Sequence, residues 1–194
     1  HIREIDGQYT AQAYITTDQD DNQITAFHPG AMNYSHENRI SEANGCTIGL
    51  VSPDGRDGML QHAEQFAEAG IPFMFDPGQG MPMFDGDDLM RFAGQARWLA
   101  FNDYEAKLMQ ERTGRSPRQL AEMVDAVIVT RGGEGSSIYT SKQVYEIPAA
   151  QAASLQDPTG CGDAYRSGLL YGLMNGLDWE LTGRVAALMG AIKI

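Results

Sequence analysis

The sequence alternates short apolar runs with longer segments of helical periodicity, and this alternation constrains the fold more than any other feature. Each apolar run is bounded by turn-forming residues, and the runs span 46–52, 71–76, 97–101 and 126–130. The helical segments between them span 54–69, 86–95 and 102–124, the last of them broken near TGRSP. Buried strands joined by amphipathic helices form βαβ units. The pattern therefore predicts an α/β fold with a mostly parallel sheet and helices on both faces.

Two regions lie outside this alternation. After the last run, GSSIYT and QVYEIP predict a small antiparallel pair, and helices are expected at 161–176 and 180–192. Before the first run, residues 9–27 predict two strands around the polar turn DQDDN. In the first of these strands, Ala11, Ala13 and Ile15 alternate with polar or aromatic residues, which predicts a sheet with one covered face.

Composition argues against several classes of partner. The chain has 194 residues and a formal net charge of −12, and such a field repels both nucleic-acid backbones and anionic membranes. The cysteines, Cys46 and Cys161, form no CxxC pair, which favours a reducing cytoplasm. The sequence begins HIREIDGQYT without Met and ends inside the apolar run AALMGAIKI, so a partial chain is expected.

Polar or glycine-rich residues follow three of the apolar runs. PGQG follows FMFD, NDYE follows WLAF, and RGGEG follows VIVT. Because α/β proteins bind ligands beyond the carboxyl ends of parallel strands, we expect these segments to share one site.

The stretch DPTGCGDAYRSG, residues 157–168, places glycines and a carboxylate at the start of a predicted helix. Glycine lets the backbone approach an anion closely, and a helix N-terminus favours negative charge, so Gly160, Cys161 and Gly162 form a candidate anion site. Asp163 is a candidate general base, because a carboxylate beside such a site can accept the proton of an attacking hydroxyl. A simple helix cap by Asp163 after a glycine turn explains the same residues equally well.

NDYE and VTRGGEGS are weaker signals when each is taken alone. The i, i+3 spacing places Asn102 and Glu105 on one helical face, where their oxygens suit a hydrated Mg²⁺ ion. An ordinary cap with a solvated Glu is the favoured alternative for this pair. The second segment offers a candidate phosphate-binding backbone at Thr130, Gly132, Gly133 and Gly135. By itself, that segment is better explained as a turn into the antiparallel pair.

Together, the three segments resemble the PfkB, or ribokinase-like, family of carbohydrate and nucleoside kinases. DPTGCGD is similar to the family's second signature, NDYE to its N-x-x-E motif, and VTRGGEGS to its nucleotide-binding T-x-G-x-x-G segment, in the family's order. Cys161 stands where the family usually has Ala, a change that keeps the backbone N–H. The resemblance implies a partial β-strand lid in residues 1–33 and a partial ribokinase-like α/β domain in residues 34–194. The family's N-terminal segment and C-terminal tail are missing from this sequence.

The resemblance also implies a role for each candidate residue. Asp163 resembles the catalytic base, and the N–H groups of Gly160, Cys161 and Gly162 resemble the anion hole for the γ-phosphoryl group. Asn102 and Glu105 resemble residues that organise Mg²⁺ and its waters near the phosphates of ATP. The resemblance implies that ATP is faced by Thr130, Gly132, Gly133 and Gly135. It implies that a monovalent cation such as K⁺ lies beside Asp157 and Thr159.

The resulting hypothesis is a cytoplasmic kinase that uses ATP and Mg²⁺ to phosphorylate a hydroxyl group of a sugar or a ribonucleoside. Such phosphoryl transfer depends on positioning and electrostatics. Adenosine is the preferred substrate, and a homodimer through the lid is expected, because exposed strand edges are commonly protected by pairing. The alternative is a non-catalytic nucleotide or sugar sensor on the same fold, which would bind ATP without turnover. A sugar-binding domain of periplasmic type is a third hypothesis, which the glycine–aspartate motif disfavours.

Overall fold

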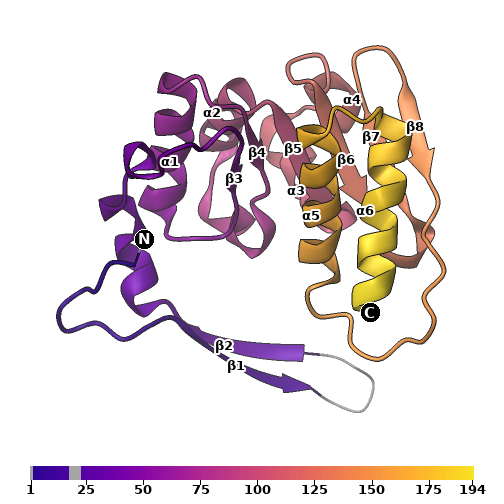
Figure 1. The fold of residues 1–194 in the computed structure, drawn as a ribbon. Coiled ribbons are helices and arrows are strands. Elements are labelled where there is room, and N and C mark those ends of the chain that lie inside the picture. The colour runs from indigo at the N-terminus through magenta and orange to yellow at the C-terminus, as the bar shows by residue number, and fades with distance from the viewer. Residues whose placement is uncertain (1, 18–22) are drawn as a thin grey trace.

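The computed structural model of the protein describes residues 2–17 and 23–194. Within these residues the main sheet has six strands in the order β3-β4-β5-β6-β7-β8 (Figure 1). The strands are β3 Gly49–Val51, β4 Phe73–Phe75, β5 Trp98–Asn102, β6 Ala126–Thr130, β7 Ser136–Tyr139 and β8 Val144–Ile147. Strands β3 to β6 are parallel, whereas β6-β7 and β7-β8 pair antiparallel. The predicted parallel sheet and its antiparallel pair are therefore confirmed.

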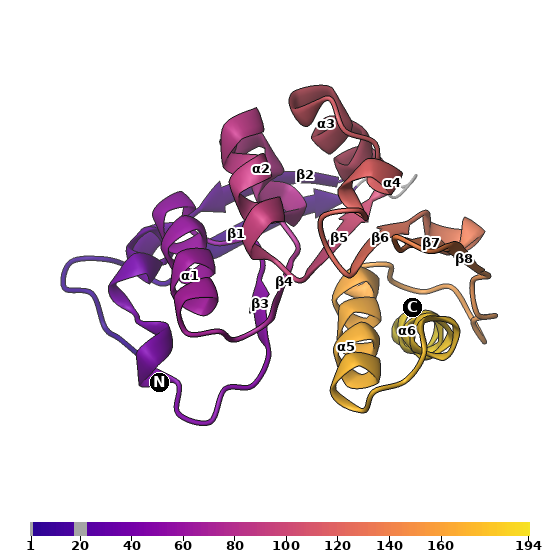
Figure 2. The same cartoon turned by 90° about the horizontal axis from the view of Figure 1, so that it is seen from above.

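Helices cover both faces of this sheet, as the alternation predicted. The helices on one face are α1 Arg56–Glu68, α2 Gly86–Gln95, α3 Asp103–Thr113 and the short α4 Pro117–Leu120. The helices on the other face are α5 Cys161–Met174 and α6 Trp179–Lys193 (Figure 2). Side chains of β4 alternate between the two cores, with Phe73 and Phe75 facing the first group of helices and Met74 the second.

The break near TGRSP has a local cause. Helix α3 ends at Gly114, which adopts φ of 70° in the left-handed region. Ser116 then begins α4 with a capping box, since its side chain accepts from the Gln119 N–H and the Gln119 side chain accepts from the Ser116 N–H. One long periodic segment therefore becomes two helices, because the sequence contains a stop signal at Gly114 and a start signal at Ser116, two residues later.

The predicted lid is an antiparallel hairpin of β1 Gln12–Thr17 and β2 Gln23–His28. It projects from the main body on the side where α5 begins (Figure 1). Residues 18–22, which are the whole of the expected turn DQDDN, lie outside the described part of the chain. The expectation of a covered face is wrong here, because Ala13 is exposed and Ile15 is 49% exposed. Alternation of apolar and polar residues shows only that one face of the hairpin could be buried. The hairpin projects away from the main sheet, so nothing in the described residues covers that face.

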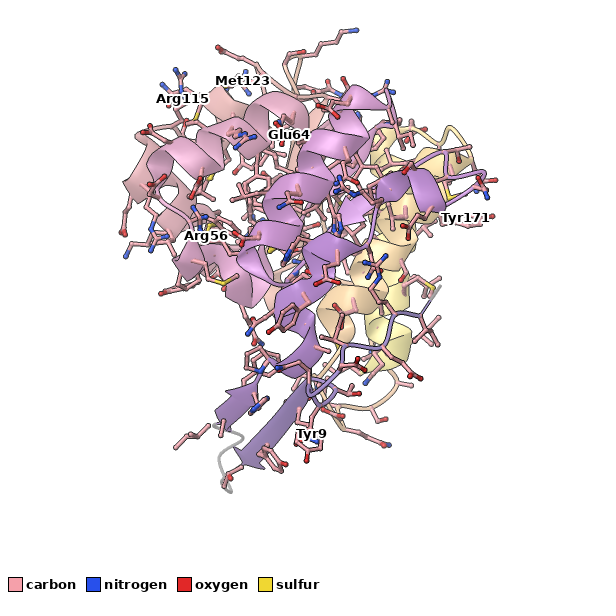
Figure 3. All side chains as sticks on the ribbon, turned by 90° about the vertical axis from the view of Figure 1, so that its left-hand side faces the viewer. Tyr9, Arg56, Glu64, Arg115, Met123 and Tyr171 are labelled. Atoms are coloured by element: carbon pink, nitrogen blue, oxygen red, sulfur yellow. The ribbon has the colours of Figure 1, made fainter. Side chains whose placement is uncertain are left out.

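The segment FHPGAMN returns the chain from the hairpin into the short 3₁₀ helix η1 Gly30–Glu37. Gly30 has φ of 50°, and a Cβ there would lie 2.1 Å from the Tyr9 carbonyl oxygen. That oxygen accepts the Ala31 N–H at 2.8 Å, so both ends of the hairpin are tied together at its base. Tyr9 itself is 78% exposed (Figure 3).

In the residues that the structure describes, no helix is both long and apolar enough to cross a membrane.

Candidate active site

The carboxyl ends of the parallel strands bring two of the sequence motifs together. Asn102 at the end of β5 lies opposite Thr130 at the end of β6 in the strand register. The Thr130 hydroxyl lies 3.4 Å from the Phe101 carbonyl oxygen of the neighbouring strand. Asp76 follows β4 at the same edge, and its N–H donates to the Val51 carbonyl at 2.9 Å. NDYE and the glycine segment after β6 are thus neighbours because the strands are parallel and adjacent.

Asn102 and Glu105 form a complete capping box at the start of α3. The Glu105 N–H donates to Asn102 Oδ1 at 2.7 Å, and the Asn102 N–H donates to Glu105 Oε2 at 2.8 Å. Asn102 Nδ2 also donates to Glu105 Oε1 at 2.9 Å. Glu105 is 7% exposed, and this burial raises its pKa against the opposing effect of the Asn102 backbone hydrogen bond. The alternative of a cap with a solvated Glu is half correct, because the cap is present but the carboxylate is buried.

These contacts decide how the pair could hold a magnesium ion. Both Glu105 oxygens already accept hydrogen bonds from Asn102. Among the described residues, no three His, Cys, Asp or Glu side chains gather in a group that could hold a metal directly. Mg²⁺ keeps several of its waters in protein sites. The residues present therefore suit a hydrated ion that is held through water and substrate phosphates, and they do not suit a direct cage.

Helix α5 begins at the glycine–aspartate signature. Its N-cap is Gly160, in the left-handed region with φ of 82°, which glycine adopts without strain. Asp163 lies in the first turn and is exposed, and its Oδ2 lies 3.9 Å from the position that a Cβ on Gly160 would take. Nothing in the described part of the chain donates a hydrogen bond to its carboxylate, so the structure contains no capping bond from Asp163. The carboxylate is left available to accept a proton.

A cavity of about 590 Å³ joins this helix start to the segment after β6. Its lining includes Thr130, Gly132, Gly133 and Gly135 together with Cys161 and Gly162. The volume lies in the ordinary range of small-molecule sites, roughly 300–1,000 Å³. Two motifs that are separate in the sequence therefore face one space.

Asp157 and Thr159 lie just before α5 and are exposed. The Thr159 N–H donates to Asp157 Oδ1 at 2.9 Å, and hydrogen bonds from Thr159 lower the pKa of Asp157. Lys193 Nζ lies 3.5 Å from the Asp157 carbonyl oxygen, a neighbour that the sequence did not indicate. Neither Asp157 nor Thr159 lines the 590 Å³ cavity.

A buried ion pair joins α5 to the end of β4, and sequence reasoning missed it. Arg166 Nε donates to Asp76 Oδ2 at 2.6 Å, and Nη2 donates to Oδ1 at 2.8 Å. The side chains of Arg166 and Asp76 are 11% and 8% exposed. Burial raises the pKa of Asp76, and the charge and hydrogen bonds of Arg166 act to lower it. The nearby negative charge of Asp163 also raises the pKa of Asp76. The available signal was weak: an Asp that ends a strand, and an Arg one turn after the candidate base.

A second buried contact joins the same helix to another strand of the sheet. The Tyr165 and Ser136 hydroxyls lie 2.6 Å apart and share a hydrogen bond between α5 and β7. Burial raises the pKa of Tyr165. The first two turns of α5 are thus fixed to the end of β4 by Arg166 and to β7 by Tyr165.

Comparison with known proteins identifies the family. The chain matches the description "pfkB family carbohydrate kinase" over residues 1–194. The chain belongs to the pfkB family. The predicted ribokinase-like α/β fold with a small antiparallel lid agrees with the solved pfkB-type structures that are similar to it.

Among similar pfkB-type proteins are nucleoside kinases. A structure of the nucleoside kinase of Burkholderia thailandensis in complex with inosine superposes with a TM-score of 0.94 at 54% identity, covering 97% of this chain and 63% of that one. Another structure of that enzyme, in complex with ADP-inosine, gives a TM-score of 0.92. The nucleoside kinase of Methanocaldococcus jannaschii is 33% identical over 185 residues, which cover 95% of this chain and 61% of that protein. The chain thus spans less than two thirds of the length of these relatives.

Proposed function

We propose that this protein transfers the γ-phosphoryl group of ATP to a hydroxyl group of a ribonucleoside. One observation carries the proposal: Cys161 and Gly162, at the start of α5, line the cavity that the glycine segment after β6 also lines. The candidate base Asp163 lies in the same turn but outside that lining. The similarity to nucleoside kinases, one of them crystallised with inosine and with ADP-inosine, supports a nucleoside over a simple sugar as the acceptor. Inosine joins adenosine as a substrate to be tested.

In the proposed mechanism, Asp163 accepts the proton of the substrate hydroxyl as its oxygen attacks the γ-phosphorus. The new O–P bond forms while the bond to the ADP oxygen breaks, and ADP leaves with the electron pair. Backbone N–H groups of Gly160 and Gly162, at the positive end of α5, stabilise the charge on the transferring group. The Cys161 N–H donates to the Pro158 carbonyl at 3.1 Å, so it joins them only when that bond is given up. The free, exposed carboxylate of Asp163 supports its assignment as the base.

The nucleotide is proposed to occupy the 590 Å³ cavity. The backbone at Thr130, Gly132, Gly133 and Gly135 would lie against the phosphates. An apolar part of the lining, formed by Ala149, Ala150, Ala152, Ala187 and Ala191, suits the flat surface of a base.

Asn102 and Glu105 are proposed to hold Mg²⁺ through its waters, near the phosphates. When bound, the ion neutralises charge that develops on the phosphate oxygens. The capping box keeps both side chains rigid, so waters bound to the ion would meet a fixed set of oxygens.

Two other features implied by the family are also proposals. K⁺ would lie beside Asp157 and Thr159, and a comparison of turnover in K⁺ and in choline chloride tests this. Lys193 already supplies a positive charge next to the Asp157 carbonyl. A homodimer through the exposed lid is tested by measuring the mass of the protein in solution by light scattering.

The base is tested by Asp163→Asn, assayed with ATP and each of inosine, adenosine, ribose and fructose. We expect kcat to fall by about 100-fold or more, because a general base contributes that much, while ATP binding is retained. Asp57→Asn is the matched control, since Asp57 is also an exposed carboxylate in the first turn of a helix. Unchanged turnover in Asp163→Asn would refute the assignment of the base. ATP binding without turnover in the wild-type protein would favour the sensor instead.

A further inference from the structure

Arg166 uses only part of its guanidinium to bind Asp76. Nε and Nη2 make the bidentate pair with the two carboxylate oxygens, at 2.6 and 2.8 Å. Within the described residues, Nη1 donates to no acceptor, although the side chain as a whole is 11% exposed. Because the guanidinium group is planar, the direction of Nη1 is fixed once Nε and Nη2 are bound to Asp76.

The free nitrogen lies at the candidate anion hole. Arg166 Nη1 is 2.8 Å from the position that a Cβ on Gly162 would take. Helical side chains point back toward the N-terminus, and residues four apart are neighbours, so Arg166 covers the turn that contains Gly162. Any side chain at position 162 would meet the guanidinium. The glycine thus leaves room for the guanidinium beside the backbone N–H groups.

The charges around Arg166 show why a positive group matters here. Three carboxylates, Asp76, Glu105 and Asp163, act on this single guanidinium. Burial alone would lower the pKa of Arg166, but the attraction of Asp76, with its hydrogen bonds, and the charges of Glu105 and Asp163 raise it. The whole chain carries a net charge of −12. An incoming triphosphate therefore meets strong negative charge, against which a fixed guanidinium is an effective counter-charge.

We propose that Arg166 donates from Nη1 to the transferring phosphoryl group, as a side-chain member of the anion hole, and that Asp76 is the positioning residue that aims it. The inference rests on the proposed function, since it assigns a further residue to the same phosphoryl transfer. A guanidinium at this place stabilises the charge that spreads over the phosphoryl oxygens in the transition state.

The first test is Arg166→Gln in the intact protein, with kcat and KM measured for ATP and for the nucleoside. Removal of one such donor lowers kcat by about 100-fold or more. ADP binding should change by less than about threefold, because Arg166 acts on the group that ADP has lost. Arg91→Gln is the matched control, since Arg91 also pairs with a carboxylate, Glu64, but both side chains are 47% exposed. Glu64 is labelled in Figure 3.

A second variant separates donation to phosphate from a purely structural clamp. Arg166→Gln alone leaves Asp76 buried without its partner, which destabilises a protein strongly. The double variant Asp76→Asn with Arg166→Gln replaces the ion pair by two neutral amides that can bond each other. If Arg166 donates to the phosphoryl group, the double variant regains thermal stability and keeps the low kcat.

The outcomes decide between the two roles. Recovery of kcat together with stability in the double variant would show that the pair is only a clamp, and it would overturn the proposal. So would a kcat of Arg166→Gln within about threefold of the wild type, given the size of the expected loss. Absence of any nucleoside-dependent turnover in the wild-type protein is a different result, because it refutes the proposed function itself.

Discussion

Gly168 marks a close approach of the backbones of α5 and α6, and Gly168→Ala tests what this contact contributes. A Cβ at position 168 would lie 2.5 Å from Ala186 Cα and 2.9 Å from the Ala186 nitrogen. Both are backbone atoms of the facing helix, so no side chain can rotate away. Ordinary contacts of a Cβ are 3.4–4 Å. The two helices would have to separate by roughly 1 Å in a core that is packed like a crystal.

The magnitude follows from the cost of overpacking, about 1–3 kcal/mol of unfolding free energy for an added methyl that cannot be accommodated. Ala also has a higher helix propensity than Gly by about 1 kcal/mol. Gly94→Ala has this same gain without the clash, because a Cβ there meets nothing within 4 Å. For a domain of this size each kcal/mol moves Tm by about 2–4 °C. Gly168→Ala should therefore melt about 2–12 °C below Gly94→Ala.

Thermal unfolding followed by circular dichroism measures both variants in the same buffer. We also expect Gly168→Ala to lower turnover, since α5 carries Asp163 and would shift relative to the strand ends. Equal Tm values for Gly168→Ala and Gly94→Ala would refute the argument that a rigid backbone contact holds α5 in place.

Two further predictions concern buried polar groups. Burial raises the pKa of Glu105 in the folded state above its unfolded-state pKa of 4.5. The stability that Glu105 contributes is therefore fully present below pH 4.5 and is lost as pH rises through the folded-state pKa. The Tm of the wild type minus the Tm of Glu105→Gln should therefore increase as the pH falls from 7 toward 4.5. A difference in Tm that does not change with pH would contradict this. Tyr165→Phe leaves the buried Ser136 hydroxyl unpaired and should lower the unfolding free energy by about 1–3 kcal/mol. Urea unfolding should show partial recovery when Ser136→Ala is added, and a lack of recovery would assign the loss to another contact.

Much of the fold and part of the site could be predicted because they depend on local patterns and one topological rule. Apolar runs bounded by turns located each parallel strand, and adjacent parallel strands place Asn102 opposite Thr130 without further information. The break between α3 and α4 was visible in TGRSP, because Gly and Ser act there within the chain itself.

The pairs that fix α5 could not be predicted in the same way. Arg166 and Asp76 are 90 residues apart, and whether they meet depends on how α5 is rotated against the sheet. Whether Asp163 caps its helix was equally hidden, since a cap and a base both place an acid in the first turn of a helix. Among the described residues its carboxylate makes no capping bond, and the base remains a prediction for the Asp163→Asn assay.

The sequential order of the strands also affects when the site can assemble. Strands β3 to β8 follow one another across the sheet, so each new strand pairs with the one made just before it. Helix α5 is the exception, because the chain must return through residues 148–160 from β8 to the end of β4. During synthesis the sheet edge with Asp76 and Glu105 emerges long before Arg166 and Asp163. The docking of α5 is thus a late, long-range step, and a nucleotide bound to both the strand ends and α5 would favour it.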